Sequence, residues 1–288
     1  KAVQLTFHRC DGSTWQKTTL AKGSSYSLPG VRDAEGYTFM GWSTKPMQSV
    51  SPQYEAEEKI TVNGNVDLYA VVFNRTTETD LTEDQLPQVD IYKYKQVIFV
   101  GDSRTEFMEN VLTGMGESAT KNVKFVCSAG KGLDWFTTTG WAQLYSIVQH
   151  DSNSILSKKT AVIFNFGVND LSKSADYAEY YNWIAPQLKS KGCELYFMSV
   201  NPVNRLMLPN AGRADRSEAA VRSFNQYMKA NLPSAYTYID MYSYLKSTGY
   251  SFASDHYGTG TVDDGLHYTT RTYKRIFAKC MDSLRVPA

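Results

Sequence analysis

Five short apolar runs in the last two thirds of the chain most constrain how it can fold. They follow one another from Gln96 onward and are rich in β-branched and aromatic residues: QVIFVGD, KFVCS, AVIFNFG, ELYFMSV and YTYID. Stretches with helical spacing separate them, such as Trp141 to His150 and Ala219 to Leu232. Strands that alternate with helices pair in parallel, and a parallel sheet needs cover on both faces. The sequence therefore predicts an α/β domain with a parallel sheet over residues 95–288.

The first 74 residues, which we call the N-terminal module, follow a different pattern. Gly, Pro and Ser turns separate segments that alternate with period two: Val3 to Phe7, Tyr37 to Trp42, Lys59 to Val62 and Val66 to Phe73. This pattern predicts a small strand-rich domain over residues 1–74. Residues 75–94 lack apolar periodicity, contain a Pro and carry two basic against five acidic side chains. We therefore interpret residues 75–94 as a linker.

Composition excludes several classes of function. The 30 Lys and Arg face 29 Asp and Glu, which leaves no basic surplus for nucleic acid. The longest apolar runs, such as Ala161 to Val168, are far shorter than the roughly 20 residues that cross a bilayer. Four scattered cysteines without CxxC spacing argue against a zinc site and a disulfide scaffold. Because Lys1 comes first and no charged and apolar leader follows it, we expect a mature or trimmed fragment.

A serine directly follows the first of the apolar runs. Val97 to Val100 leads into Gly101-Asp102-Ser103, so Ser103 falls at the carboxyl edge of a parallel strand, where ligands bind in such folds. If a helix begins just after the serine, its N–H groups face any negative charge that develops beside the hydroxyl. A helix cap is the alternative role for this serine.

A serine nucleophile needs a base. The chain has four histidines: His8, His150, His256 and His267. His8 falls in the N-terminal module, and His150 ends an amphipathic helical stretch. His267 stands in DDGLHYT, three residues after Asp264, and this spacing brings a carboxylate within reach of an imidazole nitrogen. His256 directly follows Asp255, and adjacent side chains normally point in different directions, so we prefer His267 with Asp264. A helix-capping turn is the alternative role for that pair.

An asparagine follows another apolar run in the same way. Ala161 to Phe166 leads into Gly167-Val168-Asn169-Asp170, which predicts the Asn169 amide at the same sheet edge as Ser103. An amide N–H is neutral and directional and takes no proton from a histidine, so it suits donation to a tetrahedral oxyanion. An Asx turn that caps a helix is the alternative.

Together, the GDS, GxND and DxxH motifs in this order resemble the SGNH hydrolase superfamily, also called GDSL-type esterases. The resemblance covers residues 95–288. It implies a flavodoxin-like three-layer α/β/α fold, with Ser103 as nucleophile, His267 as base and Asp264 orienting that base. It also implies that no metal or organic cofactor takes part.

The same resemblance implies an oxyanion hole with three donors. They are the N–H of Ser103, a glycine N–H and the side-chain amide of Asn169. The glycine stands in FVCSAGKGLDW, and counting along the preceding strand favours Gly132, with Gly130 as the alternative. Cys127 replaces the Asn that is often found in that block.

The N-terminal module also carries a recognisable series: YSLPG, GYTFMGW and LYAVVF. It resembles the Listeria-Bacteroides repeat, also called the internalin B repeat, over residues 1–74. The resemblance implies a β-grasp-like fold and an extracellular setting, secreted or attached to the surface of a Gram-positive bacterium. Two roles stay open for the module: a spacer, or a contact with a cell-surface glycan or protein through exposed aromatic side chains.

We therefore expect a serine esterase that hydrolyses short acyl esters, above all acetyl esters, on extracellular carbohydrate. No long apolar lid segment is visible, which disfavours a lipase. One alternative is an O-acyltransferase that uses the same triad to pass the acyl group to a glycan hydroxyl. The other is a surface adhesion protein whose hydrolase-like domain only binds.

Overall fold

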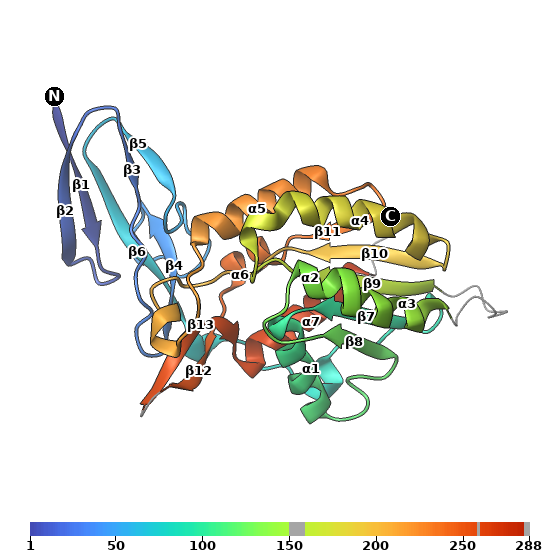
Figure 1. Cartoon of the computed structure of the whole chain (residues 1–288). Helices are drawn as coiled ribbons and strands as arrows, with labels where there is room; N and C mark the ends of the chain where they lie inside the picture. Colours follow the sequence, from blue (N-terminus) through green and yellow to red (C-terminus); the bar gives the residue numbers. More distant parts are fainter. Residues whose placement is uncertain (150–158, 258–259, 285–288) are drawn as a thin grey trace. The chain divides into compact units, whose positions relative to one another are not determined.

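A computed structural model describes residues 1–149, 159–257 and 260–284, and of residues 255–257 and 260–262 only the backbone (Figure 1). Contacts divide the chain into two compact units. The first unit combines Lys1–Glu78, Pro202–Ala219 and Tyr242–Thr269, and the second combines Thr79–Asn201, Ala220–Met241 and Thr270–Ala288. Two segments of the predicted α/β domain, Pro202–Ala219 and Tyr242–Thr269, thus belong to the same unit as the N-terminal module.

The second unit contains a five-stranded sheet in which all pairs are parallel. Its strands are β7 (Tyr94–Gly101), β8 (Val123–Cys127), β9 (Lys159–Asn165), β10 (Cys193–Met198) and β11 (Tyr236–Ile239). Their spatial order is β8-β7-β9-β10-β11, which is the flavodoxin-like order 2-1-3-4-5. In this order the direction of winding switches between β7 and β9, and ligands of such folds bind beyond the carboxyl ends of the strands at that point.

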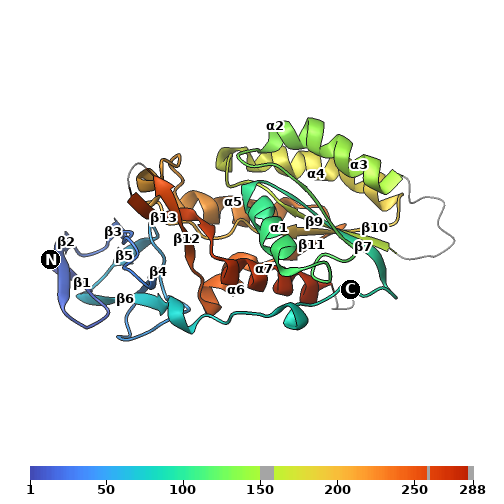
Figure 2. The same ribbon diagram turned by 90° about the horizontal axis from the view of Figure 1, so that it is seen from below.

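Helices cover both faces of this sheet. They are α1 (Ser103–Met115), α2 (Leu133–Trp135) with a π-helical turn (Phe136–Gly140), α3 (Trp141–Gln149), α4 (Ser174–Lys189), α5 (Glu218–Asn231) and α7 (Thr270–Ser283). Phe99 of β7 meets Phe277 of α7, whereas Phe164 of β9 meets Tyr181 of α4. Since Val100 pairs with Phe164, Phe99 and Phe164 point to opposite faces. Figure 2 shows α3 and α4 on one side of the strands and α7 on the other.

The three inner strands of this sheet, β7, β9 and β10, are mostly buried because they carry apolar side chains on both faces, whereas the edge strands β8 and β11 are partly exposed. Val97, Ile98, Phe99 and Val100 are each at most 1% exposed. The predicted α/β fold with a flavodoxin-like three-layer arrangement is therefore confirmed. None of the helices in the described part of the chain combines the length and the apolar character needed to cross a membrane.

The first unit is rich in strands. One sheet has the order β2-β1-β6-β4, with β2 at Thr14–Ala21, β1 at Ala2–His8, β6 at Val66–Asn74 and β4 at Tyr37–Ser43. Two smaller sheets pair β3 (Ser24–Ser27) with β5 (Lys59–Val62) and β12 (Phe252–Tyr257) with β13 (Gly260–Tyr268). The helix α6 (Met241–Thr248) and the 3-10 turns η1 (Arg75–Thr77) and η6 (Leu208–Ala211) complete this unit.

The N-terminal module has a small core of its own. Leu5, Phe7, Trp42 and Leu68 are fully buried there, and the Trp42 indole N–H donates to the Pro29 carbonyl at 2.9 Å. β1 runs parallel to β6, while β2 and β4 pair antiparallel with their neighbours. The predicted β-rich N-terminal domain is thus confirmed.

The predicted linker has structure of its own. It holds η1, a second 3-10 turn at Glu83–Gln85 and the start of β7. Leu86 and Val89 are buried, and Glu78 accepts a hydrogen bond from the Ser251 hydroxyl.

Candidate active site

Ser103 is the first residue of α1, at the carboxyl end of β7. A Cβ on Gly101 would lie 2.0 Å from Thr105 Oγ1 and 2.7 Å from the Asn165 carbonyl, so only glycine fits before the helix. The N-cap of α1 is Asp102, whose side chain accepts from the Arg104 N–H at 3.0 Å. The structure therefore gives the helix-capping role to Asp102 rather than to Ser103, and it places Ser103 in the first turn, only 5% exposed.

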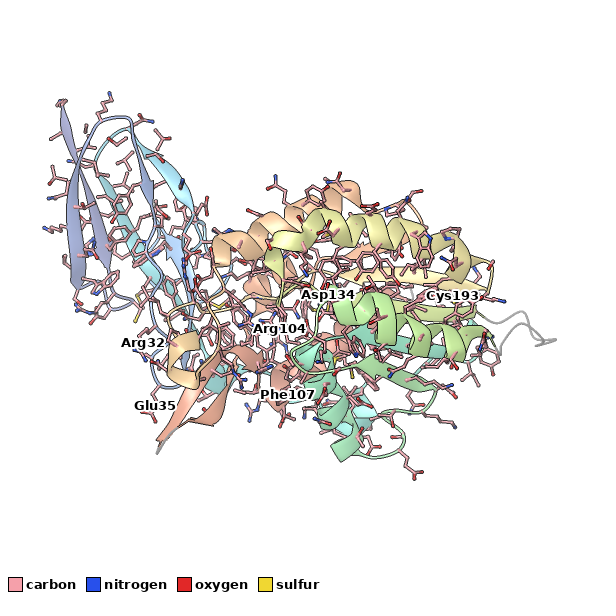
Figure 3. The ribbon with its side chains drawn as sticks, viewed as in Figure 1. Arg32, Glu35, Arg104, Phe107, Asp134 and Cys193 are labelled. Carbon is pink, nitrogen blue, oxygen red and sulfur yellow. The ribbon has the colours of Figure 1, made fainter. Side chains whose placement is uncertain are left out.

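Arg104 fixes the start of α1 from inside the fold. Its Nη1 donates to the Asn201 carbonyl at 2.8 Å, and the residue is buried. Figure 3 labels Arg104, the second residue of α1. The serine thus begins a helix whose first turn is anchored by a capping carboxylate and a buried guanidinium.

The glycine-containing loop after β8 is hydrogen-bonded both to the segment around Ser103 and to the segment around Asn169. The Ala129 N–H donates to Glu106 Oε2 of α1 at 2.7 Å, and the Ser128 N–H donates to the Gly101 carbonyl at 3.3 Å. At its far end, the Leu133 N–H donates to Asp170 Oδ2 at 2.8 Å. The loop therefore links the serine turn to the Gly-Val-Asn-Asp turn within one unit.

The two candidate glycines of this loop differ in their surroundings. A Cβ on Gly132 would lie 2.4 Å from Asp170 Oδ2, so a side chain at this position would displace the Asp170 carboxylate. Gly130 has a φ of +71° and nothing within 4 Å of the position of a Cβ. Gly130 therefore makes a turn, whereas Gly132 adjoins the segment that carries Asn169.

Asn169 and Asp170 hold the loop from the end of β9. Asn169 Nδ2 donates to the Lys131 carbonyl at 2.8 Å. An amide NH₂ carries two N–H donors, and this bond fixes the plane in which the second one lies. Asp170 also accepts from the Tyr177 hydroxyl at 2.7 Å. The motifs alone predict no role for Asp170, although its position in the GxND motif is a signal that could have suggested one.

Asp264 and His267 form a buried pair in β13. Asp264 Oδ2 lies 2.5 Å from His267 Nδ1, and the two residues are 2% and 3% exposed. Asp264 Oδ1 accepts from the N–H groups of Leu266 and His267, each at 2.7 Å. The carboxylate thus organises the backbone turn and orients the imidazole at the same time. When Nδ1–H donates to Asp264, Nε2 of the neutral ring is the basic nitrogen.

The charge of Asp264 is stabilised in this position. Burial alone would raise the pKa of Asp264, but the hydrogen bond and charge of His267 and the two backbone N–H groups outweigh it, so that the pKa is lowered. Arg213 Nη2 lies 3.6 Å from Asp264 Oδ2. A carboxylate that stays ionised can support a positive charge on the imidazole during catalysis.

The predicted site residues thus fall into two groups. Ser103, Asn169 and the glycine loop belong to the second unit, and Asp264 and His267 belong to the first. Among the other histidines, His8 binds Asp67 Oδ1 through Nε2 at 2.7 Å. His150 and the side chain of His256 lie outside the described residues.

No group of His, Cys, Asp and Glu side chains in the described part of the chain is arranged to hold a metal ion. Cys127 Sγ lies 3.3 Å from Glu109 Oε2, and burial raises the pKa of this thiol. The cysteine that replaces the asparagine of the family pattern is therefore turned toward α1.

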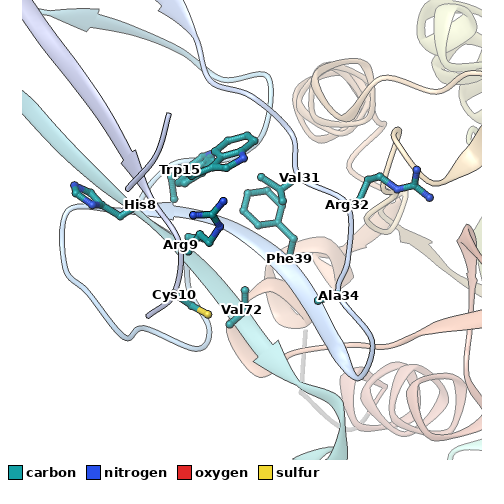
Figure 4. A pocket seen from close by; sticks show the side chains of 11 residues that line it. His8, Arg9, Cys10, Trp15, Val31, Arg32, Ala34, Phe39 and Val72 are labelled. Atoms are coloured by element: carbon teal, nitrogen blue, oxygen red, sulfur yellow. The ribbon is translucent and has the colours of Figure 1, made fainter. Parts of the chain in front are cut away.

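The N-terminal module contains a pocket of about 220 Å³ (Figure 4). Aromatic and aliphatic side chains form most of its wall: Trp15, Val31, Phe39, Trp42, Ala70 and Val72. Trp15 is 39% exposed and stacks on Trp42 with ring centroids 5.8 Å apart. Figure 4 shows Arg9 and Phe39 beside Trp15, whereas the Arg32 side chain points away.

Comparison with solved structures finds chains of similar fold. An acetyl xylan esterase, AlAXEase, is 12% identical with a TM-score of 0.43, and the match covers 66% of this chain and all of that one. The C-terminal catalytic domain of Streptococcus pneumoniae peptidoglycan O-acetyltransferase A is 15% identical with a TM-score of 0.37, over 66% of this chain and 92% of that one. A Bacillus subtilis protein is 13% identical with a TM-score of 0.41, over 99% of this chain and 98% of that one. A comparison with curated proteins finds no match.

Family models match both parts of the sequence. The Listeria-Bacteroides repeat domain matches residues 4–71. The GDSL-like lipase/acylhydrolase model matches residues 97–280, which is more than half of the chain and includes the Gly101-Asp102-Ser103 turn and the Asp264–His267 pair. The chain therefore belongs to the GDSL-like lipase/acylhydrolase family and carries a Listeria-Bacteroides repeat domain before its acylhydrolase region.

Proposed function

We propose that the protein is a serine esterase that removes short acyl groups, above all acetyl groups, from extracellular carbohydrate. The observation that carries the proposal is the buried Asp264–His267 pair, with Oδ2 and Nδ1 2.5 Å apart. An ionised carboxylate on Nδ1 makes Nε2 the proton acceptor, which is the arrangement that a serine nucleophile requires. Ser103, in the first turn of α1, is the nucleophile in this proposal.

The reaction proceeds in two acyl transfers. The Ser103 hydroxyl oxygen attacks the ester carbonyl carbon while its proton passes to His267 Nε2. The N–H groups of Ser103 and Gly132 and the Asn169 amide stabilise the oxyanion. The intermediate collapses, and the departing alkoxide takes the proton from His267 as it leaves as an alcohol. Water then attacks the acyl-serine with His267 as base, which releases the carboxylic acid and restores Ser103.

The glycine loop supports this assignment of the oxyanion donors. Gly132 lies against Asp170, and Asn169 bonds to Lys131, one residue before Gly132. Donors that such bonds hold in place need little rearrangement, and so little free energy, when the oxyanion forms. We therefore assign the glycine donor to Gly132 rather than to Gly130.

The proposed setting is outside the cell, with the protein secreted or attached to the surface of a Gram-positive bacterium. The Listeria-Bacteroides repeat domain at residues 4–71 supports it. For the N-terminal module we propose a contact with a surface glycan at the pocket beside Trp15, because an exposed aromatic ring next to an arginine suits a sugar face and its polar groups. A Trp15→Ala variant that sediments with a cell-wall polysaccharide as well as the wild type does would exclude this contact, and capture of a wall protein instead would point to a protein partner.

The function is tested by release of p-nitrophenol from acetyl, butyryl and octanoyl esters, with acetate release from acetylated xylan and O-acetylated peptidoglycan measured alongside. We expect turnover of the acetyl ester that is lost in Ser103→Ala and His267→Ala and kept in His256→Ala. Transfer of the acyl group to an added glycan acceptor in preference to water would identify an O-acyltransferase. No turnover with any ester or acceptor by the folded protein would leave the binding-only alternative.

A further inference from the structure

A buried carboxylate of the N-terminal module, Asp33, lies at the centre of a hydrogen-bond network in the first unit. Its side chain has no exposed surface. Asp33 Oδ1 accepts from the Phe39 N–H at 2.8 Å and from Asn204 Nδ2 at 3.0 Å, while Oδ2 pairs with Arg75 Nη2 at 2.7 Å. Two of these three partners lead directly to the Asp264–His267 pair.

The first route runs through Arg75. Its Nη2 holds Asp33, its Nη1 holds Asp263 Oδ2 at 2.9 Å, and its Nε donates to Thr38 Oγ1 at 3.0 Å. Asp263 is the residue immediately before Asp264. A planar guanidinium that bridges two carboxylates fixes both direction and distance. Arg75 therefore locks the chain on the N-terminal side of Asp264.

The second route runs through Asn204. Its side-chain nitrogen donates to Asp33 and to the Val31 carbonyl, each at 3.0 Å. Its backbone N–H donates to the Gly265 carbonyl at 2.9 Å. Gly265 immediately follows Asp264, and a Cβ at Gly265 would lie 2.6 Å from the Asn204 carbonyl oxygen. Asn204 therefore locks the chain on the C-terminal side of Asp264.

We propose that Asp33 is a positioning residue for the Asp264–His267 pair, so that the N-terminal module is part of the catalytic apparatus and not only a spacer. The proposal rests on the proposed esterase function, in which this pair activates Ser103. Each neighbour of Asp264 is connected to this carboxylate through one intervening residue, Arg75 or Asn204, so removal of the carboxylate loosens the turn from both sides. Displacements of about 1 Å at a catalytic group can cost about 100-fold in rate.

The energetics of Asp33 support a role beyond packing. Burial raises the pKa of Asp33 to about 6, although Arg75 and the N–H groups of Phe39 and Asn204 oppose the shift. The charge of Asp263 and the buried Tyr250 also face this carboxylate. An apolar or amide side chain at this position would avoid the free energy cost of burying a charge. Buried ionisable groups that carry this cost concentrate at functional sites.

The primary test compares Asp33→Asn with Asp67→Asn. Asp67 is a carboxylate of the same module that pairs with His8 at 2.7 Å on the module surface, so it serves as the control for loss of a carboxylate. We expect Asp33→Asn to lower kcat on the acetyl ester about 10- to 100-fold with KM changed less than twofold, and Asp67→Asn to keep the wild-type kcat. Arg75→Lys should retain more activity than Arg75→Gln, because it keeps the cation but loses the bridge. Wild-type kcat in Asp33→Asn and Asn204→Ala, both folded by circular dichroism, would overturn the proposal.

A second readout needs no enzyme activity. A short Nδ1–H bond to Asp264 gives a strongly downfield proton resonance, which is assigned by its loss in His267→Gln. We expect this resonance in the wild type and in Asp67→Asn, and its shift or broadening in Asp33→Asn and Asn204→Ala. An unchanged resonance in those two variants refutes the positioning role even if no ester is turned over. If only the esterase proposal fails, the wild type will turn over no ester, but the resonance will still shift or broaden in Asp33→Asn.

Discussion

Replacement of Asp33 by Asn should change stability in a direction that depends on pH. Burial raises the pKa of Asp33 from its ordinary value of 3.8 to about 6. At 1.36 kcal/mol for each pH unit, this shift corresponds to about 3 kcal/mol. Because the pKa is higher in the folded state, protonated Asp33 contributes to the free energy of unfolding. This contribution is fully present below pH 3.8 and is lost as the pH rises through about 6. Asn has nearly the same shape and does not ionise, so the free energy of unfolding of the variant lacks this dependence on pH.

The assay is urea denaturation of wild type and Asp33→Asn at pH 4 and pH 8. We expect the free energy of unfolding of the variant, relative to wild type, to rise by about 2.5 kcal/mol between the two pH values, because a small part of the effect is already present at pH 4. The stability of the variant relative to wild type is then more favourable at pH 8 than at pH 4, while its kcat is reduced. A difference that is independent of pH, or that falls between pH 4 and pH 8, would refute the reasoning about the buried carboxylate.

Three further predictions concern the triad, the oxyanion hole and a second anchor of the N-terminal module. Asp264→Asn should lower kcat about 10⁴-fold in ester hydrolysis, because an amide stabilises neither the required histidine tautomer nor the imidazolium. Asn169→Ala should lower kcat by about 10²- to 10³-fold with little change in KM, measured on the acetyl ester, and an unchanged kcat would remove the amide from the oxyanion hole. Glu57 accepts from the Ala219 N–H at 2.9 Å and pairs with Arg205 at 2.7 Å. Although burial alone would raise the pKa of Glu57, these bonds lower it, so its contribution to stability is present above its ordinary value of 4.5 and is lost as the pH falls. Glu57→Gln should therefore reduce the free energy of unfolding by about 1–3 kcal/mol at pH 7 in urea denaturation, less at pH 4, and leave kcat unchanged.

Local sequence patterns predicted much of the fold because they report local structure. The apolar runs after Gln96 became the five strands of the parallel sheet, and the helical spacing at Trp141 and Ala219 became α3 and α5. The spacing of Asp264 and His267 predicted that the carboxylate lies within reach of an imidazole nitrogen, and the structure has this hydrogen bond. Glycines next to the motifs were equally informative, since Gly101 stands where no side chain fits.

No local sequence pattern predicted the contacts between segments that are distant in the sequence. Asn204 meets Asp33 across 171 positions of sequence, and Arg75 meets Asp263 across 188. Arg75 falls within the stretch that we interpreted as a linker, and Asp33 lies outside every motif that the sequence analysis used. Neither position has a periodicity or spacing that would have singled it out.

The sequence by itself determined the fold class, the family and the identity of the candidate nucleophile, base and oxyanion donors, because motif spacing and hydrophobic period are local properties of the chain. Only the tertiary structure decided that Asp102 rather than Ser103 caps α1, that Gly132 rather than Gly130 adjoins the Asn169 segment, and that Asp264 and His267 share a compact unit with the N-terminal module. These outcomes depend on burial and on partners that are brought together by folding. The raised pKa of Asp33 follows from its burial, and its hold on the Asp264 turn follows from its hydrogen bonds, so both exist only in the folded chain.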